Sequence, residues 1–152
     1  MIVYRIGITK HAADLTGEGA RLNGGRWNHK STPCIYTSES RALALLEYTV
    51  NVNIYDIPRT LSYTILEIPD AGIQELKEED LPGNWKDVPA PSSIKDFGTA
   101  LLKALKTPAI KIPSSVIPDE FNYILNPKQP DNRNFKILDI KDFVYDVRIK
   151  LK

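Results

Sequence analysis

The stretch Gly24-Gly25-Arg26-Trp27-Asn28 is the most informative part of this chain. Two glycines let the main chain turn tightly and let a ligand approach it closely. The guanidinium of Arg26 follows at once, and a guanidinium can hold a phosphate through two parallel hydrogen bonds. The spacing and the Lys-Ser/Thr ending of a P-loop are missing. The stretch therefore favours a turn that faces an anionic ligand, with a solvent-facing loop arginine as the alternative.

Size and composition predict one domain over residues 1–152, with 42% hydrophobic residues to build its core. Basic and acidic residues number 20 and 19, so net charge does not indicate a nucleic-acid-binding face. A single cysteine excludes a disulfide within the chain and argues against a thiolate zinc site, and two histidines without a spaced partner do not suggest a metal. Without a signal peptide or membrane span, the expected location is the cytoplasm.

The first half of the chain alternates between apolar patterns and turn-forming residues. Residues 2–8 predict a strand, 14–33 a long loop rich in Gly, Asn, Ser and Thr, and 33–37 a short strand. A helix over residues 40–50 follows, with Ser38 or Ser40 as the candidate cap. A loop of this length inside a compact domain is usually functional or mobile.

The second half continues with short elements. Residues 61–65 alternate as a strand, residues 70–91 are irregular, and Ser93 with Asp96 resembles a capping box that opens a helix. Residues 109–112 predict a strand that Pro113 ends, and the alternation over residues 143–151 predicts a C-terminal strand. Short strands with two helices interspersed indicate an α+β domain with a mixed sheet.

Glu47 is the first candidate for chemistry. It is predicted to lie on the same helix face as Leu43, Leu46 and Val50, because it is four residues after the first and three before the last. A carboxylate on an apolar face has to be solvated by a cleft, paired or protonated. The alternative is a boundary glutamate that reaches solvent or pairs with a cation such as Arg41.

Other candidates also have structural interpretations, which pattern alone favours for Arg5 and Tyr36 and leaves open for the rest. Arg5 alternates with apolar residues and could simply belong to the polar face of an edge strand, and Tyr36 could be core or sheet surface. Ser114 lies between two prolines that could present its hydroxyl rigidly or merely form a turn. Asn122 and Asn126 share this ambiguity. No G-x-S-x-G elbow supports a serine nucleophile.

Taken in order, these stretches resemble the RES-domain family, toxins of bacterial toxin–antitoxin pairs. The matching stretches cover nearly the whole chain: Tyr4-Arg5-Ile6, Gly17-Glu18-Gly19-Ala20-Arg21, Gly24-Gly25-Arg26-Trp27-Asn28, Ile35-Tyr36-Thr37-Ser38-Glu39-Ser40, Ala42-Leu43-Ala44-Leu45-Leu46-Glu47, Ile112-Pro113-Ser114 and Asn122-Tyr123-Ile124-Leu125-Asn126-Pro127. One departure is Ile94-Lys95, where the family often has a Thr-Gln pair. Any one motif is weak, whereas the ordered set is specific.

The resemblance implies an ADP-ribosyltransferase-like fold, a split mixed sheet around an NAD cleft. It implies that Arg5, Tyr36 and Glu47 form the catalytic triad. Arg26, Ser114, Asn126 and Tyr36 would bind the dinucleotide, with Ser40 as a rival for the family serine. No metal is expected.

The expected function is a toxin that cleaves NAD⁺ at the nicotinamide–ribose bond by hydrolysis or phosphorolysis. The alternatives are ADP-ribose transfer to a protein, or a non-catalytic module that binds a nucleotide or a partner. The resemblance also implies an Xre-type helix-turn-helix antitoxin that covers the active site, with no direct contact between this chain and nucleic acid or membrane.

Overall fold

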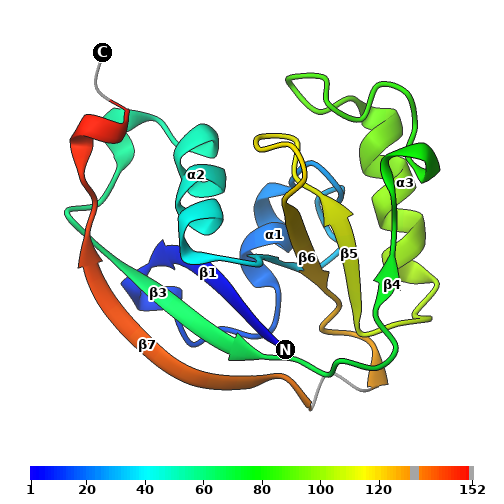
Figure 1. Cartoon of the computed structure of the whole chain (residues 1–152), viewed down its shortest axis with the longest axis horizontal. Coiled ribbons are helices and arrows are strands. Elements are labelled where there is room, and N and C mark those ends of the chain that lie inside the picture. The colour runs from blue at the N-terminus through cyan, green and yellow to red at the C-terminus, as the bar shows by residue number, and fades with distance from the viewer. Residues whose placement is uncertain (131–133, 151–152) are drawn as a thin grey trace.

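The computed structural model describes residues 1–130 and 134–150 and shows a mixed sheet beside which the helices pack (Figure 1). Over these residues the sheet has seven strands in the order β4-β5-β6-β2-β1-β3-β7. The strands are β1 Ile2–Ile8, β2 Ile35–Ser38, β3 Thr60–Glu67, β4 Gln74–Glu75, β5 Ala109–Pro113, β6 Phe121–Leu125 and β7 Lys136–Val144. The helices are α1 Glu18–Asn23, α2 Arg41–Asn51 and α3 Ser92–Lys103, with 3₁₀ turns that include Thr9–His11, Ile54–Asp56, Glu78–Asp80 and Val147–Ile149. This architecture confirms the predicted α+β class.

The two halves of the sheet are connected by minimal strand pairing at its middle. Strand β1 pairs along its whole length with β3, but it meets β2 at the single pair Tyr4–Ser38. Strands β2, β6 and β5 form the other half, in antiparallel register. The sheet is therefore split between β2 and β1, as the predicted class requires.

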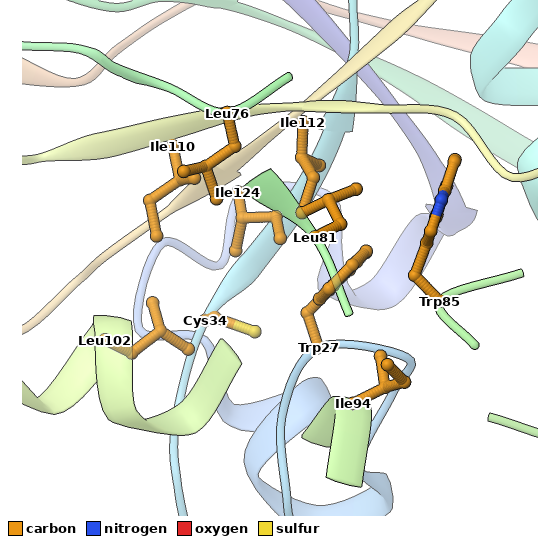
Figure 2. Close-up of a cluster of buried hydrophobic side chains, with 10 residues drawn as sticks. All are labelled: Trp27, Cys34, Leu76, Leu81, Trp85, Ile94, Leu102, Ile110, Ile112 and Ile124. Atoms are coloured by element: carbon orange, nitrogen blue, oxygen red, sulfur yellow. The ribbon is translucent and has the colours of Figure 1, made fainter. Parts of the chain in front are cut away.

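Apolar side chains fill three clusters around this split sheet. The largest lies between α3 and the β5–β6 half, and it includes Trp27, Trp85 and Ile94 (Figure 2). A second cluster lies on the face that carries Val3 and Leu125, and a third packs α2 against β1 and β3. Among the described residues, no helix has the length and apolar character needed to cross a bilayer.

Most predicted elements are present. Strands β1, β2, β3 and β5 and helices α2 and α3 lie where the patterns placed them. Ser40 is the cap of α2, because its Oγ accepts the Leu43 N–H at 3.0 Å. Strands β4 and β6 and most of β7 were not predicted. Strand β4 lies in the segment 70–91 that was expected to be irregular, and β7 overlaps the predicted C-terminal strand only at residues 143–144. In the sheet β4 pairs with β5, β6 with β2, and β7 with β3.

Two further expectations were wrong in detail. The long loop contains α1, in which Arg21 donates to the Glu18 carboxylate, as is typical of residues three apart on a helix. The Ser93–Asp96 capping box is absent, because α3 begins at Ser92 after Pro91 and has no side-chain cap. Asp96 instead contacts His29 Nε2 at 2.5 Å.

The predicted C-terminal strand over residues 143–151 is also wrong for most of its length. Strand β7 ends at Val144, opposite Thr60, where its partner β3 begins. Beyond this point no strand of the described chain extends the ladder, and Asp146 accepts the main-chain N–H of Arg148 at 3.0 Å. This local bond favours the turn over an extended strand. Leu151 lies outside the described residues.

Candidate active site

The Glu47 carboxylate is half-buried at the meeting point of α2, β5 and β6. One of its oxygens, Oε1, accepts two hydrogen bonds of 2.7 Å each, from Ser114 Oγ and from Asn122 Nδ2. Among the described residues, no hydrogen bond or ion pair reaches the second oxygen, Oε2. The alternative interpretation, a pair with Arg41, is not observed, since the Arg41 guanidinium lies over the Tyr4 ring, 4.8 Å from its centroid. Neutral donors thus hold Glu47 through Oε1, and Oε2 is left available for a ligand.

Ser114 is oriented so that its proton points at this carboxylate. It lies just after β5, is 3% exposed, and its Oγ accepts the main-chain N–H groups of Val116 and Ile117 at 3.0 and 3.1 Å. Because both N–H groups donate to the hydroxyl oxygen, the hydroxyl hydrogen is left for Glu47. The turn after Pro113 therefore presents the serine rigidly, as the bracketing prolines suggested.

Asn122 is placed by strand register. It pairs with Ser38 across β2 and β6, and with Ile112 across β5 and β6, so its side chain shares a face with Ser38. Ser38 Oγ donates to Asn122 Oδ1 at 2.6 Å. We call Ser38, Glu47, Ser114 and Asn122 the carboxylate cluster. Sequence reasoning left Asn122 undecided and considered Ser38 only as a helix cap, since no local pattern shows which strands pair.

The Tyr36 hydroxyl is held by residues 24–28, which we call the glycine turn. Its Oη donates to Asn28 Oδ1 at 2.6 Å and accepts the Trp27 N–H at 3.0 Å. Burial raises the pKa of Tyr36 well above its ordinary value, so the phenol stays neutral. Gly25 lies against the ring, where an added Cβ would be 2.6 Å from Oη. This close approach requires the glycine.

Arg26 binds main-chain oxygens. Its Nη1 donates to the carbonyls of Trp85 and Asp87 at 2.9 and 2.8 Å, which ties the glycine turn to the segment before α3. Among the described residues no partner is recorded for its Nη2 and Nε groups. These donors are the ones with which Arg26 could meet an anion. Its predicted ligand-binding role stays a prediction.

Arg5 lies on the opposite face of the sheet from the carboxylate cluster. Tyr4 pairs with Ser38 and thus shares the cluster's face, and successive side chains of a strand point to opposite faces. The Arg5 guanidinium donates to the carbonyls of Asp14 and Ala12 at 2.8 and 2.9 Å. Burial lowers the pKa of Arg5, and the nearby Asp14 opposes that shift. In this geometry Arg5 fixes the segment after β1, and its place in the predicted triad stays a prediction.

Asn126 is buried and bound to main chain on both sides of its amide. Its Nδ2 donates to the Leu102 carbonyl at 2.8 Å, and its Oδ1 accepts the Lys128 N–H at 3.1 Å. It lines a hollow of about 330 Å³ beside α3 together with Ser31, Thr32, Pro33, Leu102, Lys103, Leu105 and Lys128. Asn126 thus lies apart from the carboxylate cluster.

Of the other predicted site residues, the structure brings Ser114 into contact with Glu47, and it places Arg26 in the glycine turn that holds Tyr36.

Comparison with known proteins identifies the family of this chain. The profile of the RES domain matches residues 2–146. This chain belongs to the RES-domain toxin family. It is 34% identical to a protein named Toxin Res of Yersinia enterocolitica, over 99% of this chain and 100% of that protein. It is 33% identical to the Prs ADP-ribosylating toxin of Sphingobium sp., over 93% of this chain and 89% of that protein.

A solved structure confirms the fold of this RES domain. The crystal structure of the M. tuberculosis MbcT–MbcA toxin–antitoxin complex contains a chain that superposes with a TM-score of 0.74. The superposition covers 94% of this chain and 84% of that one at 18% sequence identity. The RES assignment made from ordered motifs is confirmed by the family profile and the relatives, and the superposition confirms the fold class.

Proposed function

We propose that this RES domain cleaves NAD⁺ at the nicotinamide–ribose bond and acts as the toxin of a toxin–antitoxin pair. The observation that carries the proposal is Glu47: a carboxylate held through one oxygen by neutral donors, with its other oxygen available. Such a group suits a reaction in which positive charge builds on a sugar. The Sphingobium relative is named an ADP-ribosylating toxin, and ADP-ribosylation begins with the same bond.

The proposed reaction needs no strong general acid. The C1′–N bond breaks, its electron pair passes to the pyridinium nitrogen, and nicotinamide leaves as a neutral molecule. The ribose is left with oxocarbenium character, which the negative charge of Glu47 stabilises while Oε2 accepts a ribose hydroxyl. Water or phosphate then attacks C1′ and loses a proton, giving ADP-ribose or its 1-phosphate.

Other groups would supply orientation. The neutral Tyr36 ring offers a surface for nicotinamide, and the remaining donors of Arg26 suit the pyrophosphate. Arg5 would act through the segment that it anchors after β1. Held groups of this kind raise the rate by removing the entropy cost of alignment.

The experiment is product analysis of the purified chain with NAD⁺, with and without phosphate. We expect nicotinamide release by the wild type, and a rate at least about 100-fold lower in Glu47→Gln. Glutamine can still accept the bonds of Ser114 and Asn122, so the variant removes the charge and not the fold. The matched control is Glu39→Gln, because Glu39 is exposed and, in the described part of the chain, its carboxylate accepts one hydrogen bond, from the Phe121 N–H. A folded wild type that releases no nicotinamide would overturn the proposal.

A second candidate is transfer of ADP-ribose to a protein, which the Sphingobium name favours. Biotinylated NAD⁺ separates the two, because label stays on a polypeptide only if transfer occurs. The non-catalytic alternative predicts saturable NAD⁺ binding without nicotinamide release. An antitoxin partner of Xre type that covers the site is part of the proposal, supported by the fold shared with a chain of a toxin–antitoxin complex. Co-expression with the neighbouring gene should then abolish NAD⁺ loss in cells.

A further inference from the structure

We propose that Ser38 and Asn122 are positioning residues that fix Glu47 with its Oε2 turned to the substrate. This inference rests on the proposed function and extends it to two residues that do not touch the reacting atoms. The bonds run in one direction, from Ser38 Oγ to Asn122 Oδ1 at 2.6 Å and from Asn122 Nδ2 to Glu47 Oε1 at 2.7 Å.

The direction of these bonds determines the orientation of the Asn122 amide. An amide has an oxygen that only accepts and a nitrogen that only donates. The Glu47 carboxylate only accepts, so the amide nitrogen has to face it, and the Ser38 hydroxyl then donates to the amide oxygen on the other side. Ser38 is 3% exposed, so water has little access to replace its hydroxyl. A flipped amide would turn its oxygen toward the carboxylate, where two acceptors repel.

The neutrality of the donors matters as much as their direction. A lysine or arginine in the place of Asn122 would hold the carboxylate equally well, but its positive charge would cancel the field that an oxocarbenium ion requires. Ser114 and Asn122 instead fix the carboxylate and leave its net charge intact. They also occupy Oε1, so only Oε2 can meet a ribose hydroxyl.

The test compares variants of the two positioning residues in NAD⁺ cleavage. Asn122→Asp keeps the size but places a second carboxylate against Oε1, and we expect kcat to fall about 100-fold with KM for NAD⁺ within about threefold. Ser38→Ala should lower kcat about tenfold, because Asn122 Oδ1 loses the hydrogen bond that holds the amide in place against Glu47. The matched control is Asn51→Ala, since Asn51 donates to the main-chain carbonyl of Glu47 and not to its carboxylate. Wild-type kcat in Asn122→Asp would overturn the proposal.

A second measurement does not depend on activity. The side-chain amide signals of Asn122 in a ¹⁵N NMR spectrum should shift in Glu47→Gln and in Ser38→Ala, and stay in place in Asn51→Ala. If the wild type released no nicotinamide, the proposed reaction would fail while these shifts would still test the geometry. Unchanged Asn122 signals in both variants would show that the bonds do not form and would sink the positioning role.

The outer edge of the sheet carries a separate inference. Strand β7 is the last strand of the sheet and nine residues long, and among residues 1–130 and 134–150 its pairing partner is β3 (Figure 1). Several of its apolar side chains are open to solvent, with Leu138 51%, Ile140 37% and Val144 67% exposed. A long edge strand has unpaired main-chain groups that can pair with another strand.

We propose that this edge pairs with the β7 edge of a second copy, antiparallel, about a twofold axis at Ile140. In that register each Asp139 faces the Lys141 of the other copy, so two opposite-charge pairs form at once. Centring the axis on Asp139, Lys141 or Asp142 would instead put like charges opposite each other. Within one chain Asp139 Oδ2 and Lys141 Nζ are 3.9 Å apart, and Asp139 Oδ1 accepts the Ile140 N–H at 2.8 Å. On dimerisation Asp139 exchanges both contacts for the Lys141 of the second copy, which frees the Ile140 N–H at the axis. The register is thus self-complementary.

Charge reversal tests this register. Analytical ultracentrifugation of the wild type should show a weak dimer, because one strand edge buries little area. Asp139→Lys alone and Lys141→Asp alone should each be monomeric, whereas an equimolar mixture of the two should dimerise, as should the double variant. Lys106→Asp, an exposed charge reversal outside β7, is the control and should behave as the wild type. A wild type that stays monomeric at millimolar concentration, or single variants that dimerise like it, would overturn the proposal.

Discussion

The carboxylate cluster and the glycine turn use polar groups in opposite ways. In the cluster, side chains bond to side chains, and Glu47 retains an oxygen without a partner among the described residues. In the glycine turn, the side chains of Arg26 and Asn28 donate to main-chain carbonyls. Asn28 is 0% exposed and its Nδ2 donates to the carbonyls of Ala20 and Thr32. The bonds of the glycine turn therefore stabilise the fold, while those of the cluster hold the Glu47 carboxylate in a fixed orientation.

This difference separates two kinds of variant. Substitutions in the cluster should change the rate of NAD⁺ cleavage and leave the melting temperature nearly constant. Substitutions that disturb the glycine turn should lower the melting temperature first, because the turn is hydrogen-bonded to α1 and β2 and packs closely against Gly98 of α3. The following variants test that division.

The largest effect is expected from Gly98→Ala in α3. An added Cβ would lie 2.0 Å from the Trp27 carbonyl oxygen, so the glycine turn and α3 would have to move apart. Overpacking of this kind costs about 3 kcal/mol of unfolding free energy. Chemical denaturation measures it. Gly19→Ala is the matched control, because an added Cβ at this helical position meets nothing within 4 Å. Equal stability of the two variants would contradict the close packing.

The same contact marks a limit of sequence reasoning. Alternation and helix periodicity predicted most of the sheet and two of the three helices, because these patterns depend on neighbours along the chain. The approach of Trp27 to Gly98, and of Gly25 to Tyr36, depends on residues far apart in sequence. The strand pairing that brings Asn122 to Ser38 is equally non-local.

In the candidate site too, features that depend on neighbouring residues could be predicted, whereas those that depend on distant residues could not. Glu47 could be predicted because a carboxylate among apolar helix positions needs an explanation, and ordered motifs pointed to Ser114. The alternation of β1 predicted that Arg5 and Tyr4 point to different faces of the sheet. It could not show which of these faces carries the carboxylate cluster, because that depends on the pairing of Tyr4 with Ser38. Nor could the sequence show that Asp146 would end the last strand, since that depends on where β3 begins.

Ser114→Ala tests whether a substitution in the carboxylate cluster changes the rate more than the stability. It removes one of the two donors to Glu47 Oε1 and should lower kcat about 30-fold, equivalent to about 2 kcal/mol for a hydrogen bond to a charged group. The melting temperature should fall only slightly, because the half-buried N–H groups of Val116 and Ile117 can turn to water. Steady-state kinetics and a thermal melt check this together. Ser115→Ala, one residue on, should match the wild type in both, and a larger loss of stability than of rate would refute the division.

The two arginines offer a paired test. Arg5→Met removes two bonds to the segment after β1 and should lower melting temperature and kcat together. Arg26→Met loses two carbonyl bonds as well, but it also loses donors that the described residues leave free. If those donors hold the pyrophosphate, KM for NAD⁺ rises about tenfold in Arg26→Met beyond any change in Arg5→Met. The same KM in both variants would remove the phosphate role from Arg26.

The smallest effect is expected from Tyr36→Phe, which lies where the two regions meet. The variant keeps the ring against Gly25 but removes the hydroxyl that links Asn28 Oδ1 and the Trp27 N–H. Losing these bonds inside the protein should cost about 1 kcal/mol of unfolding free energy. If the ring alone meets nicotinamide, kcat stays within about twofold of the wild type, because phenylalanine presents the same face. A stable variant with a large fall in kcat would instead assign the hydroxyl to the chemistry and join the glycine turn to the carboxylate cluster as one site.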